Sequence, residues 1–482
     1  MTDLHELGVR ALAAAVRGRE VSAVEVAGHV LDRAGRIGPS VGAFAVLAPD
    51  RALAEARAAD AAVRAAYAAG EPARLPGLTG VPVPAKGLDR VAGLPWTRGS
   101  AALAGEVADV DDGVVTSLRD AGAVVPGTTS TPELGLPCYT EPEGLPPART
   151  PWDLSRGAGG SSGGAAAAGA AGLVAAALGS DGGGSIRIPA ACCGLVGLKP
   201  SRGRVSFGPH GVDLSGLAVH GALTRDVRDT ALLLDVLAGP RPGDPYRPPP
   251  PRTSFLDACD RDPGSLRVGV LTVPVVVADA PVDAECRDAV DATARVLESL
   301  GHRVEPAPPP FPGDPAEMWG AFEVLWAVLA AAAPVPPGHE HLLRPLTRWL
   351  RGRGAVVSGP AHLSAVAAGQ VATRAAASAW AAYDVVLTPT VARLPPLVGE
   401  LRDDADPAAD FAAQTRFTPW TSVWNLTGAP SISLPLHRVE RAGRVLPVGV
   451  ALGGRPDGEE QLLALAAQLE AEAPWPLPPM PD

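Results

Sequence analysis

The sequence predicts an α/β fold, in which helices alternate with the strands of a largely parallel sheet. Segments with apolar residues at helical spacing follow short runs of β-branched residues along much of the chain. The hydrophobic fraction of 46% and the charged fraction of 19% are typical of a chain that buries a large core. A length of 482 residues allows either several domains or one large body, and length alone does not decide between them.

The N-terminal part is expected to be helical. Apolar positions at helical spacing in 4–36, together with the capping-box pattern of Ser22 and Glu25, predict two helices, the second beginning near Ser22. The alanine-rich segment 50–69 predicts a third helix. The valine and proline run that follows would break a helix, so it predicts a short buried strand that ends at Lys86.

The alternation continues along the rest of the chain. Helices are expected at 116–121, 224–237, 283–300 and 461–470, and strands at 123–125, 267–271, 302–305, 385–390 and 431–434. A proline-rich connector at 239–252 interrupts this pattern, but strands occur on both sides of it. The sheet is therefore expected to continue past the connector.

Composition excludes several classes of partner. A formal charge of −11 disfavours a nucleic-acid surface, because phosphate binding relies on clustered Lys and Arg. No secretory signal is recognised at the N-terminus, so a cytoplasmic protein is expected. The apolar stretch 163–178 is short and rich in Ala and Gly, which predicts a packed helix and no membrane span. The 5 cysteines lack CxxC spacing and are expected to be reduced thiols.

Lysine is very rare in this chain. Of 41 basic residues only Lys86 and Lys199 are lysines, and the others are arginines. Arginine is not deprotonated in proteins, whereas a buried lysine can be. Each lysine is therefore a candidate for a site that needs a neutral amine, with chance survival as the alternative.

Two glycine-rich loops flank one predicted helix. In the second loop three glycines precede Ser185, so backbone N–H groups could approach an oxyanion without steric obstruction. Neither lysine lies in a Walker arrangement, which disfavours a phosphate-binding loop. For this tetrapeptide alone, a flexible loop with an incidental serine remains the simpler interpretation.

A serine nucleophile needs a base, and none of the 9 histidines has a flanking pattern that marks it as one. His339 and His341 form an HxH pair, but a third metal ligand is not recognisable. Lysine is an alternative base, since Ser-Lys variants of the catalytic triad exist.

The glycine-rich region resembles the amidase signature enzymes. The resemblance rests on GGSSGG at 159–164, DGGGSIR at 181–187, PAACCG at 189–194 and GLKPSRGR at 197–204. It extends to the strand that ends at Lys86 and to the C-terminal segments WNLTGAPSIS at 424–433 and LPVG at 446–449.

This resemblance implies a set of site residues and a mechanism. The family's nucleophile falls on Ser185, its bridging serine, preceded by a cis peptide bond, on Ser161, and its lysine on Lys86. The oxyanion donors would be the backbone N–H groups of Gly182, Gly183 and Gly184, with Ser185 as a further candidate. A neutral Lys86 would take a proton from Ser161 while Ser161 takes one from Ser185. No metal or organic cofactor is implied.

Other matched positions are expected to be structural. Asp181 and Arg187 are expected to form an ion pair around the nucleophile, and Lys199 to be a structural charge. The chain also departs from the family pattern: Gly87 follows the lysine where an aspartate is common, and the segment 128–132 replaces a usual Thr-Asn turn. These departures concern the surroundings of Lys86.

The resemblance also refines the predicted fold. It implies a single amidase signature domain over 1–482, with the signature core at about 80–210 and the connector 239–252 as a surface loop. The sheet is expected to be mixed and mostly parallel, with helices covering both faces. Members of this family are often homodimers, and a homodimer is compatible with this sequence.

Three functions compete. The first is an amidase that hydrolyses a carboxamide C–N bond to a carboxylate plus ammonia or an amine. The second is an amidotransferase A-type subunit that supplies ammonia for tRNA-dependent amide synthesis, which commonly carries Gln where this chain has Ile188. The third is an inactive binding module, disfavoured because all three catalytic positions are filled. The segments 133–150 and 310–350 are rich in Pro, Leu, Ala and Trp, which suggests a small-molecule amide with a hydrophobic acyl or aryl group.

Overall fold

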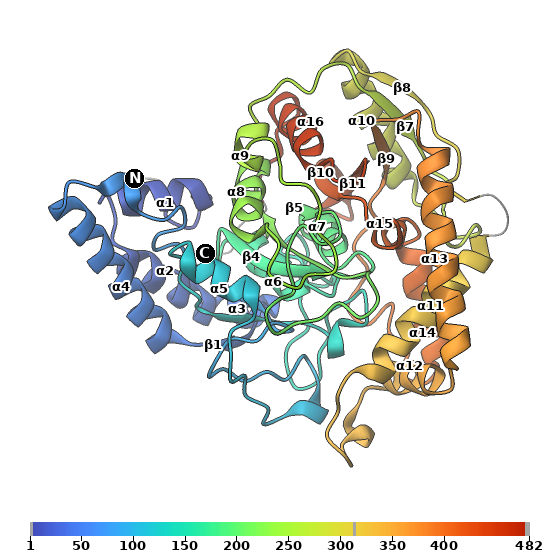
Figure 1. Ribbon diagram of the computed structural model, residues 1–482, viewed down its shortest axis with the longest axis horizontal. Coiled ribbons are helices and arrows are strands. Elements are labelled where there is room, and N and C mark those ends of the chain that lie inside the picture. Colours follow the sequence, from blue (N-terminus) through green and yellow to red (C-terminus); the bar gives the residue numbers. More distant parts are fainter. Residues whose placement is uncertain (1–2, 312–314, 478–482) are drawn as a thin grey trace.

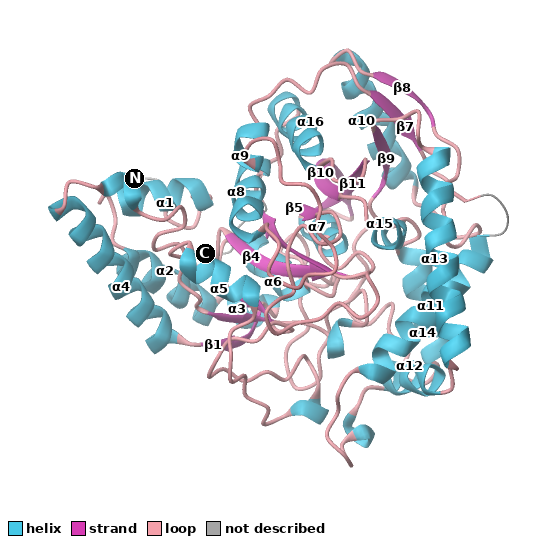
Figure 2. Cartoon of the chain, in the orientation of Figure 1, coloured by secondary structure: helices cyan, strands magenta, loops and turns pink. Residues whose placement is uncertain are grey.

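The computed structural model describes residues 3–311 and 315–477 and contains two sheets (Figures 1 and 2). The large sheet has 8 strands in the order β4-β6-β5-β10-β11-β9-β7-β8, and a small sheet has 3 strands in the order β1-β3-β2. The bounds of the strands are β1 Phe44–Leu47, β2 Ala85–Lys86, β3 Gly127–Thr129, β4 Ala176–Asp181, β5 Val196–Lys199, β6 Val219–Thr224, β7 Arg267–Val270, β8 Arg303–Pro306, β9 Val385–Pro389, β10 Ser431–Arg441 and β11 Arg444–Gly454. The prediction of an α/β protein with a large mixed sheet is confirmed.

The predicted predominance of parallel pairing is wrong. Only β9, β7 and β8 pair in parallel in the large sheet, and the other neighbours from β4 to β9 are antiparallel. The centre of the sheet is a long hairpin, β10–β11, which turns at Ala442 and Gly443 with φ values of 51° and 73°. Two consecutive left-handed residues are typical of a two-residue hairpin turn, which makes its strands antiparallel. The strand predicted at 431–434 covers only the first part of β10, which continues to Arg441.

The helices observed include those predicted at the N-terminus. Ser22 and Glu25 form the expected capping box at the start of the second helix. The bounds are α1 Val9–Arg17, α2 Ala23–Arg36, α3 Gly38–Val41, α4 Pro49–Ala68, α5 Gly113–Asp120, α6 Gly163–Ala170, α7 Arg187–Cys193, α8 Val227–Leu237, α9 Phe255–Ala258, α10 Ala284–Ser299, α11 Pro315–Ala332, α12 Pro345–Ala355, α13 Gly359–Ala379, α14 Pro407–Phe417, α15 Thr421–Thr427 and α16 Glu459–Glu472.

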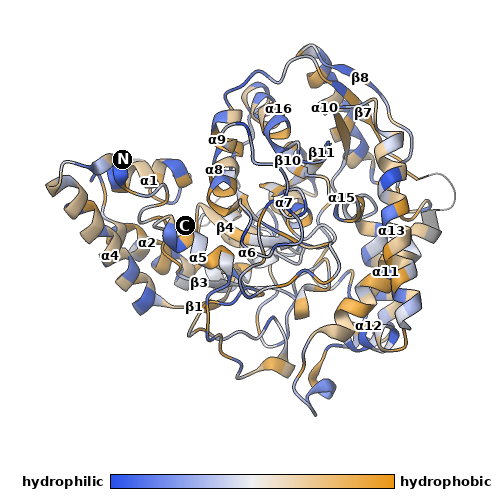
Figure 3. Ribbon diagram, in the orientation of Figure 1, coloured by the Kyte–Doolittle hydropathy of each residue, from blue (hydrophilic) through white to orange (hydrophobic). Residues whose placement is uncertain are grey.

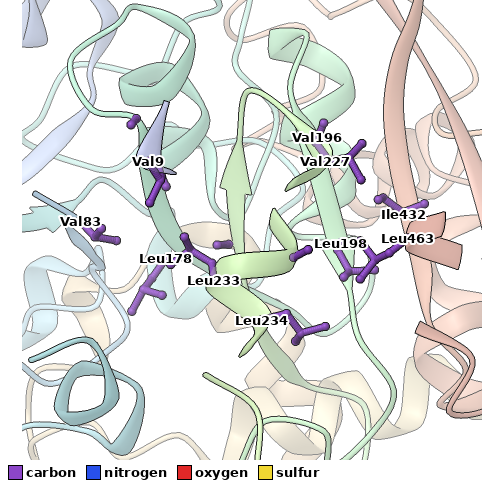
Figure 4. Close-up of a cluster of buried hydrophobic side chains, with 14 of the residues drawn as sticks. Val9, Val83, Leu178, Val196, Leu198, Val227, Leu233, Leu234, Ile432 and Leu463 are labelled. Atoms are coloured by element: carbon purple, nitrogen blue, oxygen red, sulfur yellow. The ribbon is translucent and has the colours of Figure 1, made fainter. Parts of the chain in front are cut away.

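Helices cover both faces of the large sheet, as predicted. Along β4, Ala176 and Leu178 belong to one buried cluster, whereas Ala177 between them belongs to another. The first cluster packs the sheet against α8, α10 and α16, and the second packs it against α6 and α7. Figure 4 shows the first cluster, where Leu233 and Leu234 of α8 lie near strand residues. Burying one such leucine contributes about 1.5–3 kcal/mol.

A third buried cluster joins α11, α12 and α13 to the end of the sheet (Figure 1). α11 is predominantly hydrophobic over the residues described (Figure 3), and it supplies Phe322 and Trp326 to this cluster. The connector 239–252 forms no helix and no named strand, and its residues are half-buried or exposed. Among the described residues, no helix is both long enough and apolar enough to cross a membrane.

Candidate active site

The structure brings Lys86 and Ser161 together. Lys86 ends β2 and Ser161 lies in the loop before α6. Leu178 N–H donates to the Pro84 carbonyl at 3.0 Å, which ties the segment leading to β2 to β4 of the large sheet. As a result Lys86 Nζ lies 2.8 Å from Ser161 Oγ and 3.1 Å from Ser180 Oγ. Residues separated by 75 positions therefore share one hydrogen bond.

Lys86 is fully buried, and this burial lowers its pKa to about 7. The negative charges of Asp89 and Asp181 act in the opposite direction. Removing an ammonium group from water disfavours its charged form, and this effect outweighs the nearby carboxylates. Around neutral pH the amine is therefore available in its neutral form, which can accept a proton.

Ser185 lies in the loop between β4 and α7 and is mostly buried. The Ser162 N–H donates to the Ser185 carbonyl at 3.1 Å, which joins the two glycine-rich loops. The peptide bond between Gly160 and Ser161 is cis, as the resemblance implies. Within the part of the chain that the structure describes, Ser185 Oγ makes no hydrogen bond. Hydrogen bonds between catalytic groups are often long in a free enzyme and tighten when substrate binds.

The predicted ion pair between Asp181 and Arg187 is confirmed. Both side chains are fully buried, and Arg187 Nε lies 3.0 Å from Asp181 Oδ2. Asn425 Nδ2 also donates to Asp181 Oδ1 at 2.8 Å. Burial alone would raise the pKa of Asp181, but the charge of Arg187 and the hydrogen bonds of Arg187 and Asn425 hold it well below its usual value. Asn425 belongs to the sequence motif at 424–433, but the sequence does not predict its contact with this loop.

The predicted set of oxyanion donors needs one correction. The Gly184 N–H donates to Asp181 Oδ1 at 2.7 Å, so it is not available to a substrate. The N–H groups of Gly182, Gly183 and Ser185 have no hydrogen-bond acceptor among the described residues. The Asp181 carboxylate thus occupies the Gly184 N–H group, and the N–H groups on either side of it remain available to a substrate.

Aromatic residues of α11 cover the glycine run. A Cβ atom added at Gly182 would lie 3.3 Å from Trp326, and one added at Gly183 would lie 3.4 Å from Phe322. The rings of Phe322 and Trp326 are stacked, with centroids 5.4 Å apart. Side chains on these glycines would therefore narrow the space between the loop and the aromatic wall.

Beside Ser185 lies a cavity of about 50 Å³. The two segments predicted to line it both do so: 133–150 supplies Leu136, Pro137 and Cys138, and 310–350 supplies Trp319, Phe322 and Trp326. Residues 312–314 of the second segment lie outside the described residues. The prediction of a hydrophobic lining agrees with these side chains.

A third wall of the cavity was not predicted from the sequence. α14, α15 and the short link between them contribute Phe411, Gln414, Thr415, Thr418 and Ser422. Hydrophobic periodicity identifies neither helix as part of a site, since most of their buried residues serve ordinary packing. Their position beside Ser185 results only from tertiary structure.

The described lining of the cavity includes no charged side chain. Its largest polar group, Gln414, is engaged by the protein: Cys138 N–H donates to its Oε1 at 2.8 Å, and its Nε2 donates to Asp410 at 2.5 Å. Burial raises the pKa of the Cys138 thiol well above its usual value, so it stays protonated. The cavity thus offers apolar surface and hydroxyl groups from Ser185, Thr415, Thr418 and Ser422, of which the two threonine hydroxyls donate to backbone carbonyls of α14.

No metal centre is recognisable in the part of the chain that the structure describes. Among the described residues, no group of three His, Cys, Asp or Glu side chains could hold a metal ion. The HxH pair does not converge on a shared site, because His339 Nδ1 bonds to the Ala102 carbonyl and His341 Nδ1 to the Gly338 carbonyl.

Comparisons with known proteins support this description. A putative amidase of Synechocystis sp. is 39% identical over 479 residues, which cover 98% of this chain and 90% of that protein. The solved structure of 6-aminohexanoate cyclic dimer hydrolase superposes with a TM-score of 0.90 at 31% identity, covering 99% of both chains. A bacterial aryl acylamidase of the amidase signature enzymes superposes with a TM-score of 0.86 at 26% identity, covering 98% of this chain and 97% of that one.

The fold and these similarities define the class of protein: it is a hydrolase that acts on carbon–nitrogen bonds. The family model described as Amidase matches residues 25–463. The chain belongs to this family, the amidase signature enzymes, and the resemblance found in the sequence is confirmed.

Proposed function

We propose that the protein hydrolyses the C–N bond of an uncharged carboxamide through Ser185, Ser161 and Lys86. The observation that carries this proposal is the 2.8 Å contact between Lys86 Nζ and Ser161 Oγ, made by a fully buried lysine. A buried neutral amine beside a hydroxyl is suited to accept its proton. Lysine in the role of base fits a chain in which every basic residue except Lys86 and Lys199 is arginine.

In this mechanism Ser185 Oγ attacks the amide carbon. Its proton passes to Ser161 Oγ, and the proton of Ser161 passes to Lys86 Nζ. The resulting oxyanion would accept hydrogen bonds from the N–H groups of Gly182, Gly183 and Ser185, which have no other acceptor among the described residues. A proton then returns by the same route to the leaving nitrogen, and the C–N bond breaks.

The product of this step is an ester between the acyl group and Ser185 Oγ, with ammonia or an amine released. Water then attacks the ester carbon and gives up a proton to the same relay. The C–O bond to Ser185 breaks, Ser185 regains its proton, and the carboxylic acid leaves as its carboxylate. No oxidant, reductant or metal ion is needed for this balance.

The lining of the cavity supports an apolar acyl or aryl substrate. Trp319, Phe322 and Trp326 offer flat apolar surfaces, and stacked aromatic contacts contribute about 0.5–1.5 kcal/mol beyond simple burial. Structural relatives described as an aryl acylamidase and a 6-aminohexanoate cyclic dimer hydrolase are consistent with substrates of this kind.

The amidotransferase alternative is less well supported. Free glutamine carries an ammonium and a carboxylate near its reacting amide, and burying such charges without partners costs free energy. The described lining of the cavity offers no charged side chain to either group. Ile188, where that subunit commonly carries Gln, lines the same cavity.

The proposal is tested with a panel of aryl, aliphatic and cyclic amides together with glutamine. We expect wild-type protein to hydrolyse apolar amides and to leave glutamine intact. The Ser185→Ala variant should lose activity by a factor on the order of 10³–10⁶, as typical for removal of a nucleophile. Its circular dichroism and melting temperature should match wild type. Near wild-type turnover by this variant, or faster turnover of glutamine than of apolar amides, would contradict the proposal.

A further inference from the structure

The position after Lys86 cannot hold a side chain in this structure. A Cβ atom added at Gly87 would lie 2.8 Å from the Thr129 carbonyl oxygen and 3.1 Å from Thr131 Cγ2. The first contact is with backbone and is closer than ordinary packing allows. An aspartate directly after the lysine would therefore require β3 to move, and any carboxylate beside Lys86 must come from elsewhere.

Asp89 supplies such a carboxylate from the same turn. The Asp89 N–H donates to the Lys86 carbonyl at 2.9 Å, and the Lys86 N–H donates to Asp89 Oδ2 at 3.1 Å. Asp89 is buried. Two hydrogen bonds thus join Lys86 and Asp89 across the turn, one in each direction. The side chain of Asp89 therefore helps to determine where the backbone of Lys86 lies.

His220 approaches Oδ1 of Asp89, the carboxylate oxygen that does not bind the Lys86 N–H. Its Nδ1 lies 3.6 Å from Asp89 Oδ1, and this buried nitrogen has no hydrogen-bond partner among the described residues. The ring packs on Phe207 with centroids 4.5 Å apart. His220 lies in β6, where it pairs with Ser180 of the adjacent strand β4. The Ser180 hydroxyl lies 3.1 Å from Lys86 Nζ. His220 thus belongs to the group of residues around the lysine.

The charges around this group single out Asp89. Asp112 is paired with Arg90 at 2.9 Å, and Asp181 with Arg187 at 3.0 Å. No arginine or lysine side chain pairs with Asp89 in the described part of the chain. Its negative charge is therefore left to interact with Lys86, and such an interaction strengthens when both groups are out of water.

We propose that Asp89 and His220 are positioning residues that act through Lys86. Asp89 holds the Lys86 turn and stabilises the lysine while it carries the proton, and His220 orients the Asp89 carboxylate through Nδ1. This inference rests on the proposed role of Lys86 as the base.

The directions of the pKa shifts agree with this arrangement. Burial raises the pKa of Asp89 to about 7, and Asp112 contributes to this rise, while the charge of Lys86 lowers it, so Asp89 and Lys86 each favour the charged form of the other. Burial lowers the pKa of His220 to about 4, so the ring is neutral at pH 7 and has one N–H to donate. Asp89 in turn raises the pKa of Lys86. Removing the charge of Asp89 should therefore favour the neutral amine.

The test is the pH profile of kcat/KM for Asp89→Asn with an apolar amide. The amide oxygen of Asn keeps an acceptor for the Lys86 N–H but removes the charge. We expect the acid limb to move to lower pH by about one unit, because the charge of Asp89 no longer raises the pKa of Lys86. A shift of one unit corresponds to about 1.4 kcal/mol of lost charge interaction. At the plateau kcat should fall by about tenfold, since protonated Lys86 is less stabilised, while KM should stay near its wild-type value.

Asp229→Asn is the matched control. Asp229 is equally buried and accepts a hydrogen bond from the Arg10 N–H at 3.0 Å, but it touches none of the three proposed catalytic residues. Its loss should lower the melting temperature and leave the acid limb in place. An unmoved acid limb in Asp89→Asn would overturn the role assigned to Asp89.

Two substitutions at His220 provide an independent readout. His220→Phe keeps a ring against Phe207 without a nitrogen, and His220→Asn keeps an N–H donor near the place of Nδ1. We expect kcat to fall by about threefold to tenfold in the first and to recover in the second, because the 3.6 Å polar contact between Nδ1 and Asp89 Oδ1 is lost and then restored, an effect no larger than that of one hydrogen bond. Equal kcat in wild type and His220→Phe would overturn the role of His220. Activity in Lys86→Arg would instead refute the proposed function on which this inference rests.

Discussion

Lys86 and Lys199 are both fully buried, and burial lowers the pKa of each to about 7. Their contacts differ. Lys86 Nζ reaches the hydroxyls of Ser161 and Ser180, whereas Lys199 Nζ donates to the Pro200 carbonyl at 2.8 Å. A carbonyl has no proton to give, so a lowered pKa does not by itself make a lysine a base. The expectation that Lys199 is structural and not a second base stays a prediction, and it concerns an amine whose pKa burial lowers to about 7.

The largest effect that separates the two lysines should come from Lys86→Arg. Arginine keeps a positive charge but cannot supply a neutral amine. We expect kcat to fall by about 10²–10⁴, the usual loss when a positioned general base is removed. Steady-state kinetics with an apolar amide measures this change, and a melting curve checks that the variant folds. Activity equal to wild type would mean that Lys86 contributes only charge.

The pH profile of the wild-type enzyme should show the state of Lys86 directly. Protonation of the lysine below its pKa removes the base, so kcat/KM should fall about tenfold per pH unit well below pH 7. Above that value it should reach a plateau. A rise that begins only near pH 10, close to the pKa of about 10.4 for free lysine, would show that burial does not prepare Lys86 as a base.

The smallest change in activity is expected for Lys199→Met. Since Lys199 touches no residue of the proposed triad, kcat should stay within about tenfold of wild type, less than about 1.4 kcal/mol of transition-state energy. A loss as large as that of Lys86→Arg would remove the distinction between the two lysines.

Stability should respond to Lys199→Met in a different way. Between about pH 7 and 10.5, the ordinary pKa of a lysine, the unfolded chain holds a proton on this lysine that the folded chain has released. The free energy of unfolding therefore rises with pH in this window. Lys199 contributes up to about 1.4 kcal/mol per pH unit to this rise, and the Lys199→Met variant should lack that contribution. Urea unfolding at two pH values within the window measures it. An unchanged slope would indicate that Lys199 keeps its proton in the folded protein.

Much of the local structure was predictable because it depends on neighbouring residues. The capping box of Ser22 and Glu25 spans three positions, and the ion pair of Asp181 and Arg187 spans six. Lysine scarcity, glycine-rich spacing and the family resemblance together indicate the candidate residues Lys86, Ser161 and Ser185. Spacing alone left Ser185 as a serine in a flexible loop.

The candidate catalytic residues and the start of helices such as α2 thus follow from the order of residues along the chain. The largely antiparallel sheet, the wall that α14 and α15 form in the cavity, and the hydrogen bond from Gly184 to Asp181 emerge only when distant segments pack together. The same packing brings Asp89 and His220, far apart in the chain, to 3.6 Å from each other beside Lys86. The physical reason is the range of the interactions: caps and turns are formed within a few residues, whereas strand direction, burial and the pairing of buried charges depend on which distant segments pack together.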